Sequence, residues 1–379
     1  MSKFDHLVPG HIRGMGEYVP GKSVRQAETE SGVTCIKLAS NENPFGPSAL
    51  ALEAIRQAST EVHLYPEADT AALRHVLAAK HDMDFTQVLV TAGSTAFLHI
   101  LCRALLAPGL NAITSERSFM QYPIVTQAAG GKLIRVPMKN DGFDLKAIRA
   151  AVDADTRVIF IANPNNPTGS MLPPSEIEEF LDTLPAHVLT VLDEAYSDFA
   201  SHFAAQRGVE YSRSLEYVRA GRQVVVLRTF SKAHALAGAR IGYGFAHAEL
   251  IYYLSRIKPV FSVTFIAQAA ALAAMRDHSH IQKAVENNSY GAQELTARMS
   301  ELGLRVLPTW ANFLYVDVGE DAAQFARRLE LEGVIVRPLT GTWGCPHAVR
   351  ITIGTPQQNQ VLLGALKKVV AVGTVSNRR

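Results

Sequence analysis

A lysine, an aspartate, an asparagine and an arginine occur in this chain in motifs that together could handle an aldehyde cofactor. Asn166 lies in the turn Asn-Pro-Asn-Asn-Pro-Thr-Gly, Asp193 begins the run Asp-Glu-Ala-Tyr, and Lys232 follows a serine and precedes Arg240. A lysine amine can bind an aldehyde covalently, and a carboxylate can keep a ring nitrogen protonated. A guanidinium suits a fixed phosphate dianion. The types and order of these four residues therefore predict a pyridoxal phosphate site.

Each catalytic candidate also has a plainer structural interpretation. Lys232 is predicted to hold the cofactor and to move a proton at the substrate's α-carbon, although most lysines are simply exposed. Asp193 is predicted to pair with the ring nitrogen, although an aspartate after a strand often caps a helix. Tyr196 and Asn166 are predicted to donate hydrogen bonds to the phenolate oxygen of the ring, although both residue types are common in turns. The combination of motifs favours the cofactor roles.

The predicted phosphate-binding residues lie in two segments. A Gly-Ser-Thr turn after an apolar strand would open a helix whose backbone amides face an anion, although the same turn also serves as an ordinary helix cap. The segment around the lysine adds two hydroxyl groups and a guanidinium. The predicted set is Gly93, Ser94, Thr95, Thr229, Ser231 and Arg240.

Two aromatic residues and two arginines complete the predicted site. Phe119 and Tyr122 follow the second predicted strand, and either could stack on the cofactor ring or belong to the core; we favour Phe119 for stacking. Arg350 begins an apolar strand, where a charge is costly unless it meets an anion. Arg350 is therefore predicted to bind a substrate carboxylate or phosphate, with Arg337 as a second candidate.

Composition argues against several classes of function. With 37 basic and 35 acidic residues the formal net charge is +2, so the chain has no electrostatic footprint for nucleic acid or an anionic membrane surface. The three cysteines form no CxxC pair, which argues against disulfides and a zinc site, and no metal is predicted. The N-terminus lacks a signal-peptide pattern, and no stretch reaches the ~20 apolar residues of a membrane span. We expect a cytoplasmic protein that acts on small molecules.

Seven apolar strands alternate with helix-length segments up to about residue 258. This alternation predicts an α/β fold, a three-layer sandwich in which helices cover both faces of a mostly parallel seven-stranded sheet. Ligands bind such sheets at the carboxyl ends of the strands, where the candidate cofactor residues fall. The predicted strands are residues 88–91, 111–114, 132–136, 158–162, 188–192, 223–227 and 241–245.

The length of 379 residues, of which 47% are hydrophobic, is sufficient for two lobes. Residues 1–40 are rich in glycine, proline and charge, which predicts an extended arm. Residues 41–258 are predicted to form the large cofactor-binding domain. Residues 259–379 begin with an alanine-rich helix and continue with a further helix and shorter strands, which predicts a smaller α+β C-terminal domain.

Motifs across nearly the whole chain resemble those of the fold-type I pyridoxal phosphate enzymes, and among them the histidinol-phosphate aminotransferase family. They include the asparagine-rich turn, the Asp-Glu-Ala-Tyr run and the segment around the lysine described above. The other matching segments are residues 18–22, 38–44, 65–67, 236–238, 311–313 and 350–354.

The resemblance implies a homodimer whose active sites lie at the subunit interface, with the N-terminal arm taking part. Tyr65 would reach the neighbour's cofactor phosphate, and Tyr18 would lie near the neighbour's substrate. Arg350, assisted by Arg337, would bind the carboxylate of the amino donor or the phosphate of the acceptor, and Asn41 in its family motif would contact substrate. The implied reaction is a ping-pong amino transfer between glutamate or 2-oxoglutarate and an amino compound such as histidinol phosphate.

The sequence departs from the family pattern in the residues that would surround a substrate. Thr95 and Ala96 stand where an acidic pair is common, residues 261–264 replace Phe-Asn-Val-Asn, His234 replaces an aromatic residue and Phe119 replaces a tyrosine. The alternatives are a lyase, decarboxylase or cyclase like the threonine-phosphate decarboxylase relatives, or an aromatic amino acid aminotransferase. A non-catalytic binding module is disfavoured because the lysine and the aspartate are both present.

Overall fold

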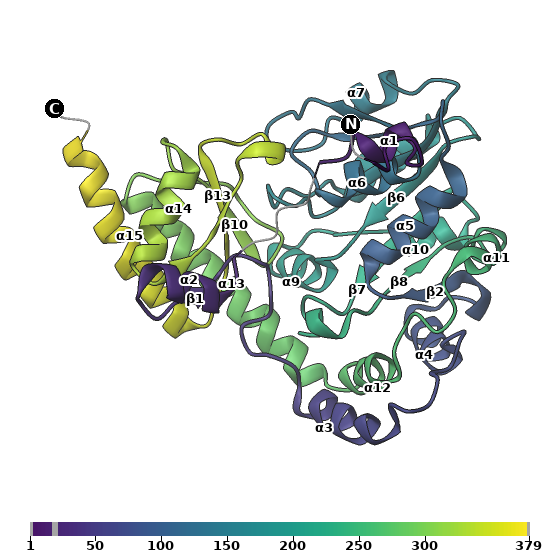
Figure 1. Ribbon diagram of the computed structural model, residues 1–379, viewed down its shortest axis with the longest axis horizontal. Coiled ribbons are helices and arrows are strands. Elements are labelled where there is room, and N and C mark those ends of the chain that lie inside the picture. The colour runs from purple at the N-terminus through teal and green to yellow at the C-terminus, as the bar shows by residue number, and fades with distance from the viewer. Residues whose placement is uncertain (1–2, 17–21, 377–379) are drawn as a thin grey trace.

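The computed structural model describes residues 3–16 and 22–376 and shows a larger and a smaller lobe (Figure 1). The larger lobe is built on a seven-stranded sheet in which β8 runs antiparallel to both neighbours and every other pair is parallel. The predicted α/β fold with a mostly parallel seven-stranded sheet is confirmed. In spatial order the strands are β2 (Val88–Thr91), β8 (Gly242–Phe245), β7 (Val224–Thr229), β6 (Leu189–Asp193), β5 (Thr156–Ala162), β3 (Asn111–Ser115) and β4 (Lys132–Val136).

The burial of these strands explains their continuous apolar sequences. In β5 the side chains from Val158 to Ile161 are fully buried, as expected of a parallel strand covered on both faces. The edge strand β4 differs, because Lys132 and Arg135 on it are exposed. Charges at an edge hinder pairing with another strand.

Ten helices of the described chain surround this sheet, joined by the short 3₁₀ turns η1 (Ser59–Glu61), η2 (Phe85–Gln87) and η3 (Ala237–Ala239). The helices are α3 (Ala49–Ala58), α4 (Ala71–His81), α5 (Ser94–Leu105), α6 (Gln121–Ala128), α7 (Leu145–Ala150), α8 (Pro174–Asp182), α9 (Ser197–Arg207), α10 (Ser214–Arg219), α11 (Ala248–Ile257) and α12 (Phe265–Ala274). The predicted domain boundaries at residues 40 and 258 stay a prediction. Helix α12 follows the second boundary, yet it packs against α3 and supplies Ala267 and Ala271 to the core of the larger lobe.

The smaller lobe has a hydrophobic core of its own, centred on residues such as Leu295, Phe325 and Ile351. Its four-stranded antiparallel sheet has the order β12 (Arg337–Pro338), β13 (Ala348–Thr352), β10 (Phe313–Asp317) and β9 (Arg305–Val306). Its helices are α13 (His278–Glu301), α14 (Ala322–Leu331) and α15 (Pro356–Ser376), with the 3₁₀ turn η4 (Gly341–Trp343). Among the described helices of both lobes, none is long and apolar enough to cross a membrane.

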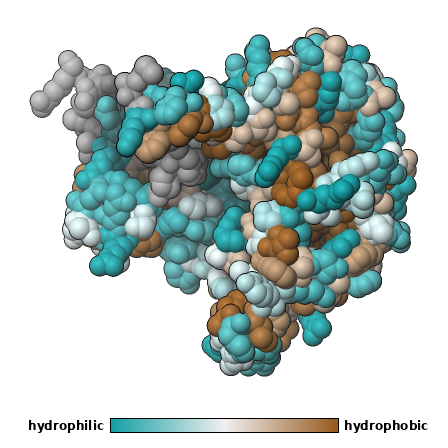
Figure 2. Space-filling view, turned by 45° about the vertical axis from the view of Figure 1, so that its right-hand side comes forward, coloured by the Kyte–Doolittle hydropathy of each residue, from teal (hydrophilic) through white to brown (hydrophobic). Residues whose placement is uncertain are grey.

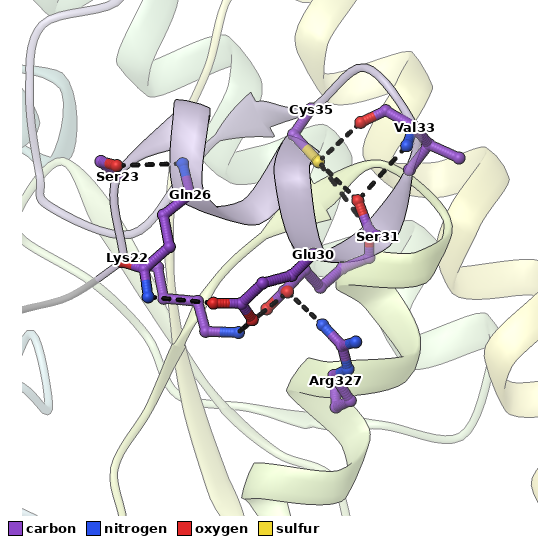
Figure 3. Close-up of polar contacts among 9 residues, drawn as sticks. Lys22, Ser23, Gln26, Glu30, Ser31, Val33, Cys35 and Arg327 are labelled. Carbon is purple, nitrogen blue, oxygen red and sulfur yellow. Dashed lines mark hydrogen bonds and ion pairs between the residues drawn. The ribbon is translucent and has the colours of Figure 1, made fainter.

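Polar contacts attach the N-terminal arm to the smaller lobe (Figure 3). Lys22 Nζ lies 2.6 Å from a carboxylate oxygen of Glu30 and 3.0 Å from one of Glu330, and Arg327 also pairs with Glu330. The short strand β1 (Ile36–Lys37) then pairs in parallel with β11 (Val334–Ile335). From Lys22 onward the arm is therefore held by the smaller lobe through both ion pairs and backbone hydrogen bonds, whereas α1 (Gly10–Arg13) contacts α6 of the larger lobe.

The arm is less extended than its composition predicted, because it contains the helices α1 (Gly10–Arg13) and α2 (Val24–Ser31). Helix α2 begins where the Ser23 side chain accepts a hydrogen bond from the Gln26 amide, and it ends at Gly32 with φ of 73°. A serine before a helix and a left-handed glycine after it are strong end signals. These caps could have been read from the sequence, although α2 has little apolar periodicity.

Candidate active site

A cavity of about 340 Å³ lies between the two lobes at the carboxyl ends of the central strands. The space-filling view shows the smaller lobe at the left, the larger lobe at the right and hydrophilic residues along their junction (Figure 2). The structure brings most of the predicted site residues to this cavity. Those that line it are Asn41, Ser94, Thr95, Phe119, Asn166, Asp193, Tyr196, Thr229, Ser231, Lys232, Arg240, Arg337 and Arg350.

Lys232 lies just beyond the end of β7 and is half-buried in the cavity wall. Its Nζ is 3.4 Å from the carbonyl oxygen of Ser40 and 5.5 Å from the centre of the Tyr196 ring. Burial, with a smaller contribution from the nearby Arg350 guanidinium, lowers the pKa of the Lys232 amine to about 7. Near neutral pH the amine can therefore exist in both its charged and its neutral form.

Asp193 ends β6, and only 4% of it is exposed. Its Oδ2 accepts a hydrogen bond from the Tyr122 hydroxyl at 3.1 Å, and its Oδ1 accepts one from the Ala195 amide at 3.3 Å. Burial raises the pKa of Asp193 and outweighs these two hydrogen bonds, which lower it, so that the pKa is about 6. A buried carboxylate of this kind needs a cationic partner, which a protonated ring nitrogen would supply.

Two side chains on the cavity wall are oriented as hydrogen-bond donors. Arg350 Nη1 donates to Asn166 Oδ1 at 2.6 Å, so the amide nitrogen of Asn166 is the group that can donate to a ligand. The Tyr196 hydroxyl accepts a hydrogen bond from Asn41 Nδ2 at 2.9 Å, and burial raises the pKa of Tyr196. The phenol therefore keeps its proton at neutral pH and can donate it toward the cavity.

The helix α5 and the Arg240 side chain meet at one end of the cavity. Gly93, with φ of 86°, precedes α5, and a Cβ added there would lie only 2.7 Å from Arg240 Nη2. Arg240 Nη1 donates to the Ala237 carbonyl at 2.8 Å, which holds the guanidinium near the helix N-terminus. Backbone amides at a helix N-terminus and a fixed guanidinium together suit a phosphate group.

Among the described residues, the predicted residues Gly93, Tyr65 and Tyr122 do not line the cavity. Tyr65 is 83% exposed, stacks on Phe261 with 4.7 Å between ring centres, and does not line the cavity. Tyr122 does not line the cavity either, because its ring packs inside the larger lobe, whereas Phe119 reaches the cavity wall. Tyr18 lies outside the described residues.

The cavity wall also contains residues that the sequence analysis did not select, namely Ala39, Ser40, Glu42, Met120, Gln121, Ala162, Pro164, Ala195, Ala237 and Trp343. Glu42 could have been found, because it lies next to Asn41 in a motif already singled out. Trp343 carried no such signal, because η4 approaches the cavity only through the fold of the smaller lobe. Among the described residues no group of three or more histidine, cysteine, aspartate or glutamate side chains could hold a metal ion.

The amine, the buried carboxylate and the phosphate-binding end thus share one cavity, and they fit pyridoxal phosphate. The sequence model of the family described as aminotransferase class I and II matches residues 33–366. The crystal structure of histidinol-phosphate aminotransferase from Sinorhizobium meliloti in complex with pyridoxal-5'-phosphate superposes with a TM-score of 0.87 at 27% identity, covering 98% of each chain. Fold, cavity and family match define a pyridoxal phosphate-dependent aminotransferase of fold type I.

Relatives of similar length indicate which family of aminotransferases this chain belongs to. Histidinol-phosphate aminotransferase 2 of Pseudomonas fluorescens is 44% identical over 366 residues, which cover 96% of this chain and 97% of that protein. Histidinol-phosphate aminotransferase of Moorella thermoacetica is 42% identical over 363 residues, covering 95% and 92% of the two chains. The chain belongs to the histidinol-phosphate aminotransferase family.

Proposed function

We propose that this enzyme transfers an amino group between glutamate or 2-oxoglutarate and histidinol phosphate. The observation that carries the proposal is that Lys232, Asp193 and Arg350 face a single cavity in a chain 44% identical to histidinol-phosphate aminotransferase 2 of Pseudomonas fluorescens. Both proposed amino donors, glutamate and histidinol phosphate, carry an anionic group near the amine. The two arginines that line the cavity besides Arg240 suit such anions.

Pyridoxal phosphate, when bound, supplies an electron-poor ring that stabilises negative charge on the α-carbon of the substrate. Lys232 would hold the cofactor covalently and then take and return a proton at that carbon, since its pKa of about 7 lets it act in both directions. Asp193 would keep a proton on the ring nitrogen. Tyr196 and Asn166 would donate hydrogen bonds to the ring oxygen, and Phe119 would pack against the ring face.

The remaining roles concern the two anionic groups. Gly93, Ser94, Thr95, Thr229, Ser231 and Arg240 would bind the cofactor phosphate. On the other side of the cavity, Arg350 and Arg337 would bind the carboxylate of glutamate or the phosphate of histidinol phosphate, and Asn41 would line the substrate position. Arg350 is 6% exposed, so a bound anion there would interact with little screening by water.

We also propose that two copies of the chain form a dimer that shares its active sites. Exposed apolar residues follow one another on and after α3, where Figure 2 shows brown residues on the lower projection of the molecule. They are Leu50, Leu52, Val62, Leu64 and Tyr65. Tyr65 would reach the phosphate in the neighbour's cavity, and Tyr18 would lie near the neighbour's substrate. Exposed apolar residues gathered in one segment favour association.

A subunit-mixing experiment tests the shared site. Lys232→Ala and Tyr65→Ala subunits, each weakly active alone, are unfolded, mixed and refolded together. A shared site predicts that mixing restores activity, because one cavity of each hybrid dimer then has Lys232 from one subunit and Tyr65 from the other. Activity equal to the average of the two separate variants would contradict the shared site.

The amino transfer itself is tested by its two halves. Glutamate alone should convert the bound cofactor to its amine form, seen as a change of its absorbance, and histidinol phosphate should do the same. A lyase would instead eliminate phosphate from histidinol phosphate, and a decarboxylase would release carbon dioxide from an amino acid such as glutamate, in both cases without leaving the amine form. If histidinol phosphate does not convert the cofactor to its amine form but another amino compound does, the proposed substrate is wrong and the enzyme is still an aminotransferase.

A further inference from the structure

Tyr122 is a fully buried side chain whose hydroxyl points at the predicted ring-nitrogen partner. It lies in the first turn of α6, and its hydroxyl donates to Asp193 Oδ2 at 3.1 Å. Its ring stacks on Phe160 of β5 with 4.7 Å between centres and 6° between planes. Phe119 packs on it in a T-shaped arrangement, with 5.6 Å between ring centres and 87° between planes. Packing by these two aromatic rings therefore fixes the position of the hydroxyl.

The surroundings of Asp193 leave this hydroxyl with a large influence on the carboxylate. Burial raises the pKa of Asp193, and the Tyr122 hydrogen bond is the strongest effect that lowers it. The neighbouring Glu194 also raises this pKa, but its charge is paired with Arg228 at 2.8 Å. The amine of Lys232 and the amide of Ala195 lower it further. Tyr196 and Tyr211 are further titratable groups near Asp193, and burial raises the pKa of both, so they stay neutral at neutral pH.

We propose that Tyr122 is a positioning residue that keeps the proton shared by Asp193 and the cofactor on the ring nitrogen. The inference rests on the proposed pairing of Asp193 with that nitrogen. A hydrogen bond donated to a carboxylate makes it a weaker base. Without the hydroxyl, the proton leaves the nitrogen for an Asp193 oxygen, the ring becomes neutral, and its capacity to withdraw electrons falls. No other bond changes.

Packing alone does not require the hydroxyl. A phenylalanine at position 122 would keep the stacking on Phe160 and the contact with Phe119, because only one oxygen is removed. Hydrogen bonds to charged partners contribute more than those between neutral groups. A role limited to packing therefore predicts that the ring nitrogen stays protonated in Tyr122→Phe. The positioning role predicts that its protonation falls.

Solid-state NMR of holoenzyme reconstituted with pyridoxal phosphate labelled with ¹⁵N in the ring reads the protonation directly. Tyr122→Phe should move the resonance toward the unprotonated position, corresponding to a roughly tenfold change in the proton-sharing equilibrium. The kcat for glutamate should fall about tenfold, while KM changes less than about twofold, because Tyr122 does not touch substrate. The matched control is Tyr217→Phe, which removes a buried hydroxyl that donates to the Pro174 carbonyl at 3.2 Å.

Two further variants keep the outcomes distinct. Substitution of Tyr122 by 3-fluorotyrosine retains a donor and should keep the resonance at its wild-type position. Asp193→Asn should move it at least as far as Tyr122→Phe does. If Tyr122→Phe keeps the wild-type ¹⁵N resonance while Asp193→Asn shifts it, the proposed role of Tyr122 is wrong and the pairing of Asp193 with the ring nitrogen stands. An unchanged resonance in Asp193→Asn would overturn the pairing of Asp193 as well.

Discussion

The two halves of the cavity are built in different ways. The cofactor half, with Asp193 and Lys232, comes from the ends of neighbouring strands β6 and β7, which pair directly in the central sheet. The substrate half, with Asn41, Arg337 and Arg350, comes from the segment after β1 and from the smaller lobe. The first half is fixed by one hydrogen-bonded sheet, whereas the second depends on how the smaller lobe meets the larger one.

Hydrogen bonds join the two halves across this junction. Arg350 donates to Asn166 Oδ1 at 2.6 Å, and Asn41 donates to the Tyr196 hydroxyl at 2.9 Å. Substitutions in the cofactor half should therefore stop the chemistry, while those in the substrate half should mainly weaken binding. The following experiments test this difference, from the largest expected effect to the smallest.

Replacement of the lysine should have the largest effect. Lys232→Ala removes both the covalent anchor and the proton-transfer group, so kcat for glutamate should fall about 10³-fold or more. Lys258→Ala is the matched control, because burial also lowers the pKa of Lys258 but its amine contacts the Ala68 carbonyl outside the cavity. Steady-state turnover is measured for both variants. Near-normal turnover of Lys232→Ala would contradict the catalytic role of Lys232 and with it the function assigned to the cofactor half.

An arginine variant tests the substrate half. Arg350→Ala should lower kcat/KM for glutamate about 10²-fold, mostly through KM, because a charge-assisted contact with the substrate anion is lost. Arg305→Ala is the control, since Arg305 is an exposed arginine of the same lobe that pairs with Asp141. A loss confined to kcat would contradict the division between the two halves.

A smaller effect is expected at the phosphate-binding end. Gly93→Ala adds a Cβ that would lie 2.7 Å from Arg240 Nη2, so the dissociation constant of pyridoxal phosphate should rise about tenfold. Gly109→Ala serves as the control, because Gly109 also has a positive φ but a Cβ there meets nothing within 4 Å. Fluorescence titration measures the cofactor affinity of both variants. Equal affinities would show that phosphate binding does not need the close approach of Gly93 to Arg240.

The smallest effect is on the pH dependence of stability. Lys232 has a pKa lowered from 10.5 to about 7 in the folded protein, so between these values the unfolded chain binds a proton that the folded chain does not. The free energy of unfolding of the apoprotein should therefore gain up to about 1.4 kcal/mol per pH unit from this group as pH rises above 7. Lys232→Met should lack that gain. Urea unfolding at pH 7 and pH 9 measures the difference, and equal slopes for both proteins would contradict the lowered pKa.

The cofactor half could be predicted from sequence because its information is local. Several apolar strands are followed within four residues by a functional residue, and parallel strands bring their carboxyl ends to one edge. The positions of Asp193 and Lys232 on one cavity follow from that rule alone. Phe119 was favoured over Tyr122 for stacking on the cofactor ring, and of the two it is Phe119 that lines the cavity.

The parts of the site that could not be predicted from sequence depend on contacts between distant segments. The bond from Tyr122 to Asp193 requires knowing how α6 packs against the central sheet, and the bond from Arg350 to Asn166 requires knowing how the two lobes meet. Trp343 reaches the cavity through a 3₁₀ turn whose sequence has no distinctive pattern. Hydrophobic periodicity specifies elements and faces, but not these pairings.

Chemical trapping of the cofactor tests the central assignment most directly. Borohydride reduction of the reconstituted enzyme, followed by proteolysis and mass spectrometry, fixes any cofactor to the side chain that holds it. The structure predicts the modification on the peptide that contains Lys232 and its loss in Lys232→Ala. Modification of Lys258 or another lysine instead, with the Lys232 peptide unmodified, would contradict the assignment.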